Sequence, residues 1–181
     1  MKKKWILATL LGMVLLFIIC IGGKKYMDKK AVEKSYQDGI ELIQNYVTDY
    51  LVKNYEGIEK IEWEGVGVEW RSSPIFGSSI LGNYVNSKAK IFVSSDKFFT
   101  VRFTLTDEAE YDGDLNKYIL KHSLNPNNID SLLELEIENA VGNFNIGDKL
   151  DQLGSKKIKK SREGSPKATI IYNLEIHELE Y

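Results

Sequence analysis

The segment NYVNSKAKIFVSSDKFFTVRFTLT, Asn83–Thr106, decides the fold because side chains of two kinds alternate along both of its halves. The first half places on one side Val85, Ala89, Ile91 and Val93. The second half places on one side Phe99, Val101, Phe103 and Leu105. Such alternation is typical of β-strands with one buried face. Because the polar residues Ser94–Lys97 between the halves are turn formers, the segment predicts a β-hairpin.

Three aromatic residues fall on the opposite side of this hairpin, namely Tyr84, Phe92 and Phe98. Two arrangements fit them. Either a helix covers this side as well, or the rings form an exposed patch suited to a partner. Trp70 and Arg71 end the preceding strand, and we assign them to the same candidate surface.

Upstream of the hairpin, the segment Ile58–Trp70 alternates with a phase error. One extra residue near Glu64–Gly65 would return the apolar side chains to a common face, which predicts a β-bulge. Before it, residues 28–54 have helical periodicity and end close to Gly57. The apolar stripe of this helix contains Tyr36, Ile40, Ile43, Val47 and Leu51. The other faces are predicted to carry Gln37, Glu41, Gln44 and Asp49.

Downstream of the hairpin, the pattern is mixed. Asp114 is a candidate cap for a short helix ending near Ser123. The segment 129–145 fits both a strand and a helix, and a capping box starting at Ser131 favours the helix. Residues 168–176 alternate like a strand, whereas the basic run 156–162 is typical of a solvated loop or hairpin arm.

Together these patterns predict an α+β fold. It comprises an N-terminal transmembrane helix, followed by a long helix packed on an antiparallel β-sheet with helical insertions. We divide the chain into a membrane anchor (1–23), a juxtamembrane and long-helix segment (24–57) and a sheet segment (58–181). Residues 31–57 and the sheet segment are expected to form one soluble domain.

The predicted anchor rests on an uncharged stretch behind Lys2–Lys4. Trp5–Gly22 contains 18 residues, or about 27 Å of helix, close to the ~30 Å hydrocarbon core of a bilayer. A cleaved signal peptide has a shorter apolar core, so an uncleaved anchor is favoured. Lipidation of Cys20 fits less well because Ile19 is large. The short basic tail favours a single-pass protein of the cell membrane, with most of the chain extracytoplasmic.

The charge is distributed unevenly along the chain. Residues 1–30 carry seven Lys and one Asp, and residues 31–181 carry 17 basic and 25 acidic groups, a net charge of −8. Such a domain is repelled by nucleic acid, which we exclude as a partner, and should prefer a basic or neutral protein. One acidic cluster is a candidate contact surface: Asp107, Glu108, Glu110 and Asp112.

Several chemistries are disfavoured. Cys20 is the only cysteine and His122 and His177 are the only histidines, too few for a structural zinc site or a Cys-His dyad in the soluble part. The glycines of EGVGVEW lack the third glycine of a dinucleotide fingerprint. The acidic cluster departs from the EF-hand pattern at Lys117 and Ser123. We therefore expect no cofactor, no metal and no enzymatic activity.

The Lys-rich start, the single apolar span, the helix ELIQNYVTDYLVKNYEGI and the strands GNYVNSKAKIFV and KFFTVRFTL resemble small membrane-anchored envelope proteins of Gram-positive bacteria. Some of these are immunity proteins against toxins delivered by type VII secretion. The resemblance covers about residues 1–106 and transfers no site residue. It implies a tethered module that occludes a secreted toxin. The alternative is an envelope sensor or structural accessory that contacts another envelope protein.

Overall fold

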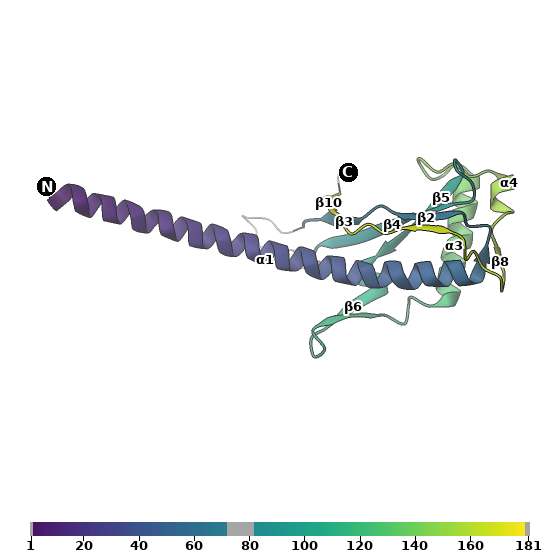
Figure 1. Ribbon diagram of the computed structural model, residues 1–181, viewed down its shortest axis with the longest axis horizontal. Helices are drawn as coiled ribbons and strands as arrows, with labels where there is room; N and C mark the ends of the chain where they lie inside the picture. Colours follow the sequence, from purple (N-terminus) through teal and green to yellow (C-terminus); the bar gives the residue numbers. More distant parts are fainter. Residues whose placement is uncertain (1, 72–81, 180–181) are drawn as a thin grey trace. The chain divides into compact units, whose positions relative to one another are not determined.

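The computed structural model describes the backbone of residues 2–71 and 82–179, and the side chains of residues 27–71 and 82–179. The helices are α1 (Lys2–Asn54), α2 (Leu105–Glu108), α3 (Pro126–Val141) and α4 (Gln152–Ser155). The strands are β1 (Tyr55–Glu56), β2 (Lys60–Trp63), β3 (Val66–Glu69), β4 (Tyr84–Phe92), β5 (Phe98–Thr104), β6 (Ala109–Asp112), β7 (Lys117–Leu120), β8 (Lys159–Lys160), β9 (Thr169–Ile171) and β10 (Ile176–Glu178). The fold is α+β, with one long helix and mixed sheets (Figure 1).

The chain divides into two compact units, Met1–Ser35 and Tyr36–Tyr181. The predicted anchor, residues 1–23, lies outside the residues whose side chains are described. Among the described residues, none of the helices combines the length and the apolar character that a membrane crossing requires.

In the second unit, α1 buries the apolar stripe that its periodicity predicts. Ile40, Ile43 and Val47 are fully buried. The helix ends at Asn54, and Gly57 follows with a φ of +86°, a left-handed conformation that glycine adopts readily. One prediction is wrong here. Gln44, assigned to a polar face, is fully buried, and its amide nitrogen donates hydrogen bonds to Ser87 and to the carbonyl oxygen of Asn173, whereas its amide oxygen has no hydrogen-bond partner among the described residues.

The bulge predicted near Glu64–Gly65 is confirmed by the pairing of β2 and β3 with the same edge of β4. Trp63 lies opposite Ala89 and Gly67 opposite Asn86, so four steps on one strand match three on the other. The extra residue lies beside Gly65, whose φ is +98°. As a result, β2 and β3 form one bulged strand with Trp63 and Val66 on the same buried face.

The last strands differ from the predicted antiparallel sheet. β9 runs parallel to β2, and β10 runs parallel to β3. The region predicted as one strand over 168–176 is interrupted between Ile171 and Ile176, where it follows the bulge of its neighbour. Side-chain alternation indicates a strand and its buried face, but it carries no information on strand direction, which here depends on the path of the chain.

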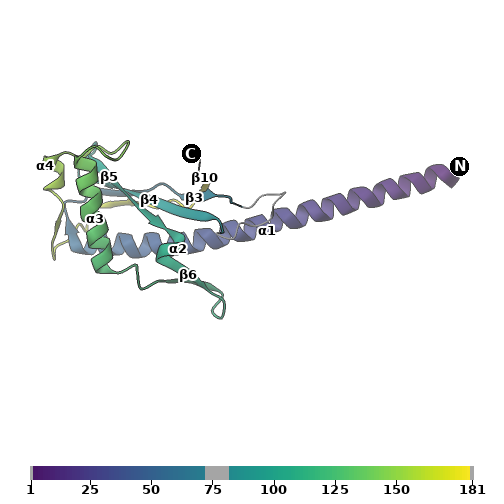
Figure 2. The same ribbon diagram turned by 180° about the vertical axis from the view of Figure 1, so that it is seen from behind.

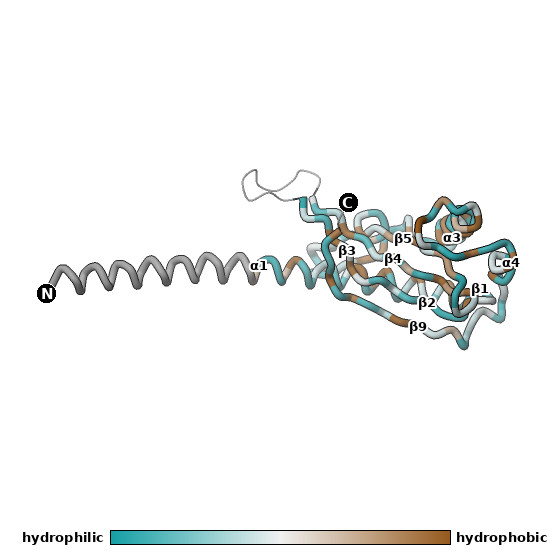
Figure 3. The backbone as a smooth tube through the Cα atoms, turned by 90° about the horizontal axis from the view of Figure 1, so that it is seen from above, coloured by the Kyte–Doolittle hydropathy of each residue, from teal (hydrophilic) through white to brown (hydrophobic). Residues whose placement is uncertain are grey.

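Within the second unit, α1 covers one face of the main sheet, which we name the inner face (Figures 1 and 2). Figure 3 views the sheet from the other side, the outer face, with α1 behind it and α3 at the margin beyond β5. Residues of α1, the sheet and α3 contribute to one buried cluster, which includes Trp63, Phe99, Phe103 and Leu133.

Two predictions for the second half of the chain can be compared with the structure. The helix proposed for 114–123 is wrong: β6 and β7 form a hairpin there, and Asp112 accepts hydrogen bonds from the backbone of its turn. The helical interpretation of 129–145 is confirmed by α3. Its cap is Asn125 with Pro126 at the first turn, instead of the predicted box at Ser131.

Candidate functional site

The outer face of the sheet carries alternating charged and aromatic side chains. It is built from the residues that point away from α1 on three neighbouring strands. They are Lys60 and Glu62 of β2, Tyr84, Lys88, Lys90 and Phe92 of β4, and Phe98, Thr100 and Arg102 of β5. A sheet face with this mixture is a natural contact surface where the described residues leave it open.

Phe92 and Phe98 form a pair at one end of this face, opposite each other on β4 and β5. Their ring centroids are 5.0 Å apart, and the Lys60 ammonium lies 3.8 Å from the centre of the Phe92 ring. Phe92 is only 8% exposed, although it points away from the main core. The pair therefore fits neither predicted arrangement: no helix of the described chain covers it, and Phe92 is buried instead of exposed.

Beside this pair, the sheet face continues into a groove of about 800 Å³. One wall is the outer face, including Lys88, Phe98 and Arg102, and the other is the end of α3 with the loop 142–148. The loop is held to the edge of β5 by reciprocal backbone hydrogen bonds between Phe98 and Lys149, 3.1 and 3.0 Å long. The Asp148 carboxylate also accepts hydrogen bonds from the backbone N–H and the hydroxyl of Thr100.

The rim of the groove presents two large apolar side chains. Phe144 is 79% exposed and Ile146 is completely exposed. The predicted helix over 129–145 would include Phe144, which is wrong because α3 ends at Val141. Sequence reasoning missed Ile146 altogether. Their signal was the sequence NFNIG, in which apolar residues alternate with turn formers outside any periodic element.

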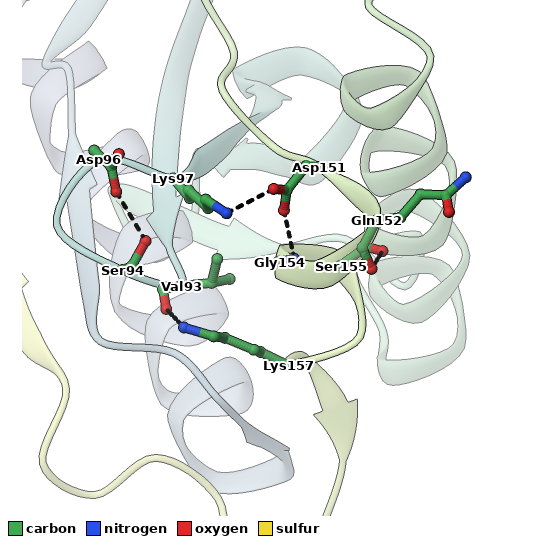
Figure 4. Close-up of polar contacts among 9 residues, drawn as sticks. All are labelled: Val93, Ser94, Asp96, Lys97, Asp151, Gln152, Gly154, Ser155 and Lys157. Carbon is green, nitrogen blue, oxygen red and sulfur yellow. Dashed lines mark hydrogen bonds and ion pairs between the residues drawn. The ribbon is translucent and has the colours of Figure 1, made fainter.

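A cluster of polar contacts supports the segment that follows this loop (Figure 4). Lys97, in the β4–β5 turn, forms an ion pair of 2.6 Å with Asp151. Asp151 also caps α4 by accepting a hydrogen bond from the backbone of Gly154. Lys157 donates to the carbonyl oxygen of Val93. These contacts attach the end of the hairpin to the 151–157 segment and so restrain the loop of the groove from its other end.

The charges of the groove are unequally paired. Lys90 lies 2.7 Å from Glu64. Lys88 and Arg102, by contrast, lie opposite each other on β4 and β5, and neither has an ion-pair partner among the residues with described side chains. Like charges in directly opposite positions on a sheet repel each other.

The remaining aromatic candidates lie elsewhere. Tyr84 is on the outer face at the other end of β4, about 26 Å from Phe92 at ~3.3 Å per residue, and Arg71 lies 5.4 Å from its ring. Trp70, assigned to the same surface, instead faces α1, with its ring 6.1 Å from that of Tyr36. This follows from the bulge, which aligns Trp70 with Val66 and Val68 on the inner face.

The acidic candidates do not surround the Phe92–Phe98 pair. Asp107 and Glu108 lie in α2, and Glu110 and Asp112 in β6. These elements follow the end of β5 that is farthest from Phe98, about 20 Å away at ~3.3 Å per residue. Burial, and next the charge of Asp107, raise the pKa of Glu108. Asp112 is used in the turn. The structure therefore separates this acidic cluster from the groove.

A polar cluster that sequence reasoning missed joins the end of α1 to α3. Asp130 accepts hydrogen bonds from the hydroxyls of Tyr50 and Tyr55, at 2.5 and 2.6 Å. It also forms an ion pair with Lys160. Burial raises the pKa of the Asp130 carboxyl, but the hydrogen bonds from Lys160, Tyr50 and Tyr55 outweigh it and lower the pKa overall. Burial and the contact with Asp130 raise the pKa of both tyrosines. These phenols stay neutral donors, so the cluster is suited to holding α3 in place.

Among the residues with described side chains, no group of three or more His, Cys, Asp or Glu is arranged to hold a metal ion. The comparisons with known proteins add no family assignment: no protein-family model, curated protein or solved structure matches this chain.

Proposed function

We propose that this chain is a membrane-tethered, extracytoplasmic protein-binding module without enzymatic activity, which acts by occluding a partner protein. The observation that carries the proposal is the groove, with Phe144 and Ile146 exposed on its rim. Large apolar side chains that stay exposed beside a concave surface are typical of protein contact sites. They would supply the apolar centre of an interface, and the charged outer face would supply its polar surroundings.

The position of the groove within the second unit supports this proposal. The chain enters the unit at Tyr36, which contacts Asn83 and Trp70. The groove lies near the other end of α1, since Phe92 pairs with Lys60 shortly after the helix ends at Asn54. The two ends are separated by about 27 Å at ~1.5 Å per residue. The groove and the residue at which the chain enters this unit therefore lie near opposite ends of the part of α1 that belongs to it.

The tether itself is proposed from the uncharged stretch Trp5–Gly22 behind Lys2–Lys4. Protease added to cells stripped of their wall should digest residues 31–181 of the full chain. Protection of the domain in intact cells would contradict the extracytoplasmic location. Release of the domain into the medium with a new N-terminus near Gly23 would show a cleaved signal in place of the anchor.

The binding proposal can be tested with a photoreactive amino acid placed in the full chain in its host cell. We expect position Ile146 to give protein adducts on irradiation. Leu115, at the turn between β6 and β7, is the matched control because it is also apolar and 58% exposed. No adduct at Ile146, or equal adducts at both positions, would contradict the proposal.

The identity of the adduct would give the proposal its specific form. In the form that the sequence resemblance implies, an immunity protein, the adduct contains a toxin, and deletion of the chain sensitises the cell to it. An integral membrane protein in the adduct would instead favour an accessory of an envelope complex.

A further inference from the structure

We propose that the edge of the main sheet formed by β9 is a dimerisation surface, where β9 pairs antiparallel with β9 of a second copy of this chain. Ile171 would lie opposite Ile171 of the other copy, at the twofold axis. The groove lies beside β5, at the other margin of the sheet. The proposal therefore goes beyond the proposed function and does not depend on it.

The first argument is that this edge of the sheet is open. Figure 3 shows β9 at the margin opposite β5 and α3. The β5 edge is covered by the backbone hydrogen bonds between Phe98 and Lys149. On the far side of β9, by contrast, no strand pairs with it among the described residues. An edge strand with unpaired backbone groups is a template for pairing with another chain.

The second argument is the direction of the backbone groups in β9. The backbone N–H of Thr169 donates to the carbonyl oxygen of Glu59, at 2.9 Å, on the side of β2. Alternate residues of a strand direct their backbone groups to the same side, so those of Ile171 also point to β2. Those of Ile170, and of Tyr172 at the end of the strand, point to the open edge. In an antiparallel pair centred on Ile171, Ile170 would exchange hydrogen bonds with Tyr172 of the other copy.

The third argument is the composition of this edge. Residues 168–174, ATIIYNL, contain neither a charged residue nor a proline. Charged side chains and prolines are features by which natural proteins prevent pairing at an exposed edge. Ile171 and Tyr172 are 43% and 48% exposed, respectively. Apolar β-branched and aromatic side chains stabilise a strand pair when they lie opposite each other, so a second strand would stabilise this segment.

The charges that flank this run select a second copy as the occupant. Lys167 and Glu175 each lie four residues from Ile171, on opposite sides of it. Antiparallel pairing centred on Ile171 brings Lys167 of each copy next to Glu175 of the other, whereas parallel pairing would bring like charges together. Neither residue forms an ion pair within the described part of the chain. The edge is therefore self-complementary, as a twofold interface requires.

The test is a disulfide at the predicted twofold axis, in the full chain in detergent micelles. Cys20, the only cysteine of the chain, is replaced in a Cys20→Ser background, and Ile171→Cys is added. Directly opposite residues in such a pair have Cα atoms about 4.5 Å apart, which a disulfide can bridge. We expect mild oxidation with copper phenanthroline to give a covalent dimer on non-reducing electrophoresis.

Thr169→Cys in the same background is the matched control, because Thr169 is an exposed residue of the same strand and the same face. It would lie opposite Asn173 of the other copy, so the two introduced thiols would be about 13 Å apart along the strands at ~3.3 Å per residue. We expect about tenfold less covalent dimer, since this distance exceeds the reach of a disulfide. Equal yields at both positions, or no dimer with Ile171→Cys, would overturn the proposal, and the latter would be the result if β9 received a strand of another protein.

Reversing the flanking charges tests the register. In the Ile171→Cys chain, Lys167→Glu or Glu175→Lys should slow dimer formation about fivefold, because each places like charges opposite each other at both ends of the pair. Mixing the two reversed chains should recover most of the rate, because their heterodimer again pairs opposite charges. This recovery would also show that the reversals leave the fold intact. Unchanged rates in the reversed chains, or no recovery on mixing, would contradict the pairing.

Discussion

Neighbouring residues of the same type can have different environments when they lie on the two opposite faces of the main sheet. Phe98 and Phe99 are adjacent in β5 and point to opposite sides. Phe99 is fully buried in the main core between the sheet and the helices. Phe98 instead stacks on Phe92 and lines the groove. The same type of side chain thus contributes to the main core on the inner face and to the lining of the groove on the outer face, because a strand alternates its sides.

The inner face is not purely apolar. Gln44 of α1 donates to Ser87 at 3.1 Å and to the carbonyl oxygen of Asn173 at 2.8 Å, and Ser87 donates to the carbonyl oxygen of Gly65. This buried network joins α1 to both interruptions of the sheet, the bulge and the break between β9 and β10. Bulges leave backbone groups without a partner in the sheet, and here Ser87 and Gln44 satisfy two such carbonyl oxygens.

The largest expected effect tests the contrast directly. Phe99→Ala should lower the free energy of unfolding by about 3–5 kcal/mol, because it leaves a cavity in the main core. Phe98→Ala should cost about 1 kcal/mol, the energy of an aromatic pair outside that core. Urea unfolding of the full chain in detergent measures both. Equal losses would show that the outer face contributes to stability as much as the inner face does.

Gln44→Met tests how much the buried polar network of the inner face contributes to stability. The change keeps the side-chain length but removes the donor to the buried hydroxyl of Ser87 and to the partly buried carbonyl oxygen of Asn173. We expect a loss of about 1–3 kcal/mol in the free energy of unfolding. Gln37→Met is the control, since Gln37 donates to Leu174 from a less buried position and should cost less. A more stable Gln44→Met protein would refute the role of this network.

Asp130→Asn tests the polar rim of the core and its dependence on pH. Its lowered pKa means that the folded state binds a proton less readily than the unfolded chain. The carboxylate should therefore contribute about 1–2 kcal/mol at neutral pH. This contribution should disappear as the pH falls from about 4, the ordinary aspartate pKa, through the lower value of the folded state.

The free energy of unfolding of Asp130→Asn and of the unchanged chain, measured from pH 7 downward, should thus converge in acid. Asp49→Asn is the control, because Asp49 forms an exposed pair with Lys53 on α1. An exposed ion pair contributes little to the free energy of unfolding, so the pH curve of Asp49→Asn should follow that of the unchanged chain. A constant gap between the Asp130→Asn curve and the unchanged chain at all pH values would contradict the assignment.

The smallest expected effect concerns the lysine that covers the outer aromatics. Lys60→Met removes a cation 3.8 Å from the Phe92 ring but keeps an apolar chain above it. We expect a loss of about 0.5–1 kcal/mol, detectable as a shift of the urea midpoint. A loss above that of Phe99→Ala would reverse the comparison of the two faces.

The candidate site was predictable in part. Alternation placed Tyr84, Phe92 and Phe98 on the side opposite the core, which the structure confirms. Alternation did not predict which of the three rings lie together: Phe92 and Phe98 form a pair, whereas Tyr84 lies at the other end of β4. Phe144 was placed in a helix and Ile146 was missed for a different reason. A loop has no periodicity, so the exposure of its residues depends on where the loop is attached, here by Phe98 and Lys149.

The sequence by itself determined the local elements of the second unit. The apolar stripe of α1, the hairpin of β4 and β5 and the bulge beside Gly65 all follow from side-chain spacing, a property of neighbouring residues. Tertiary structure decided the parallel pairing of β9 and β10, the burial of Gln44 and the groove between the outer face and the loop 142–148. These features join segments far apart in the chain, and their energies arise only when those segments meet.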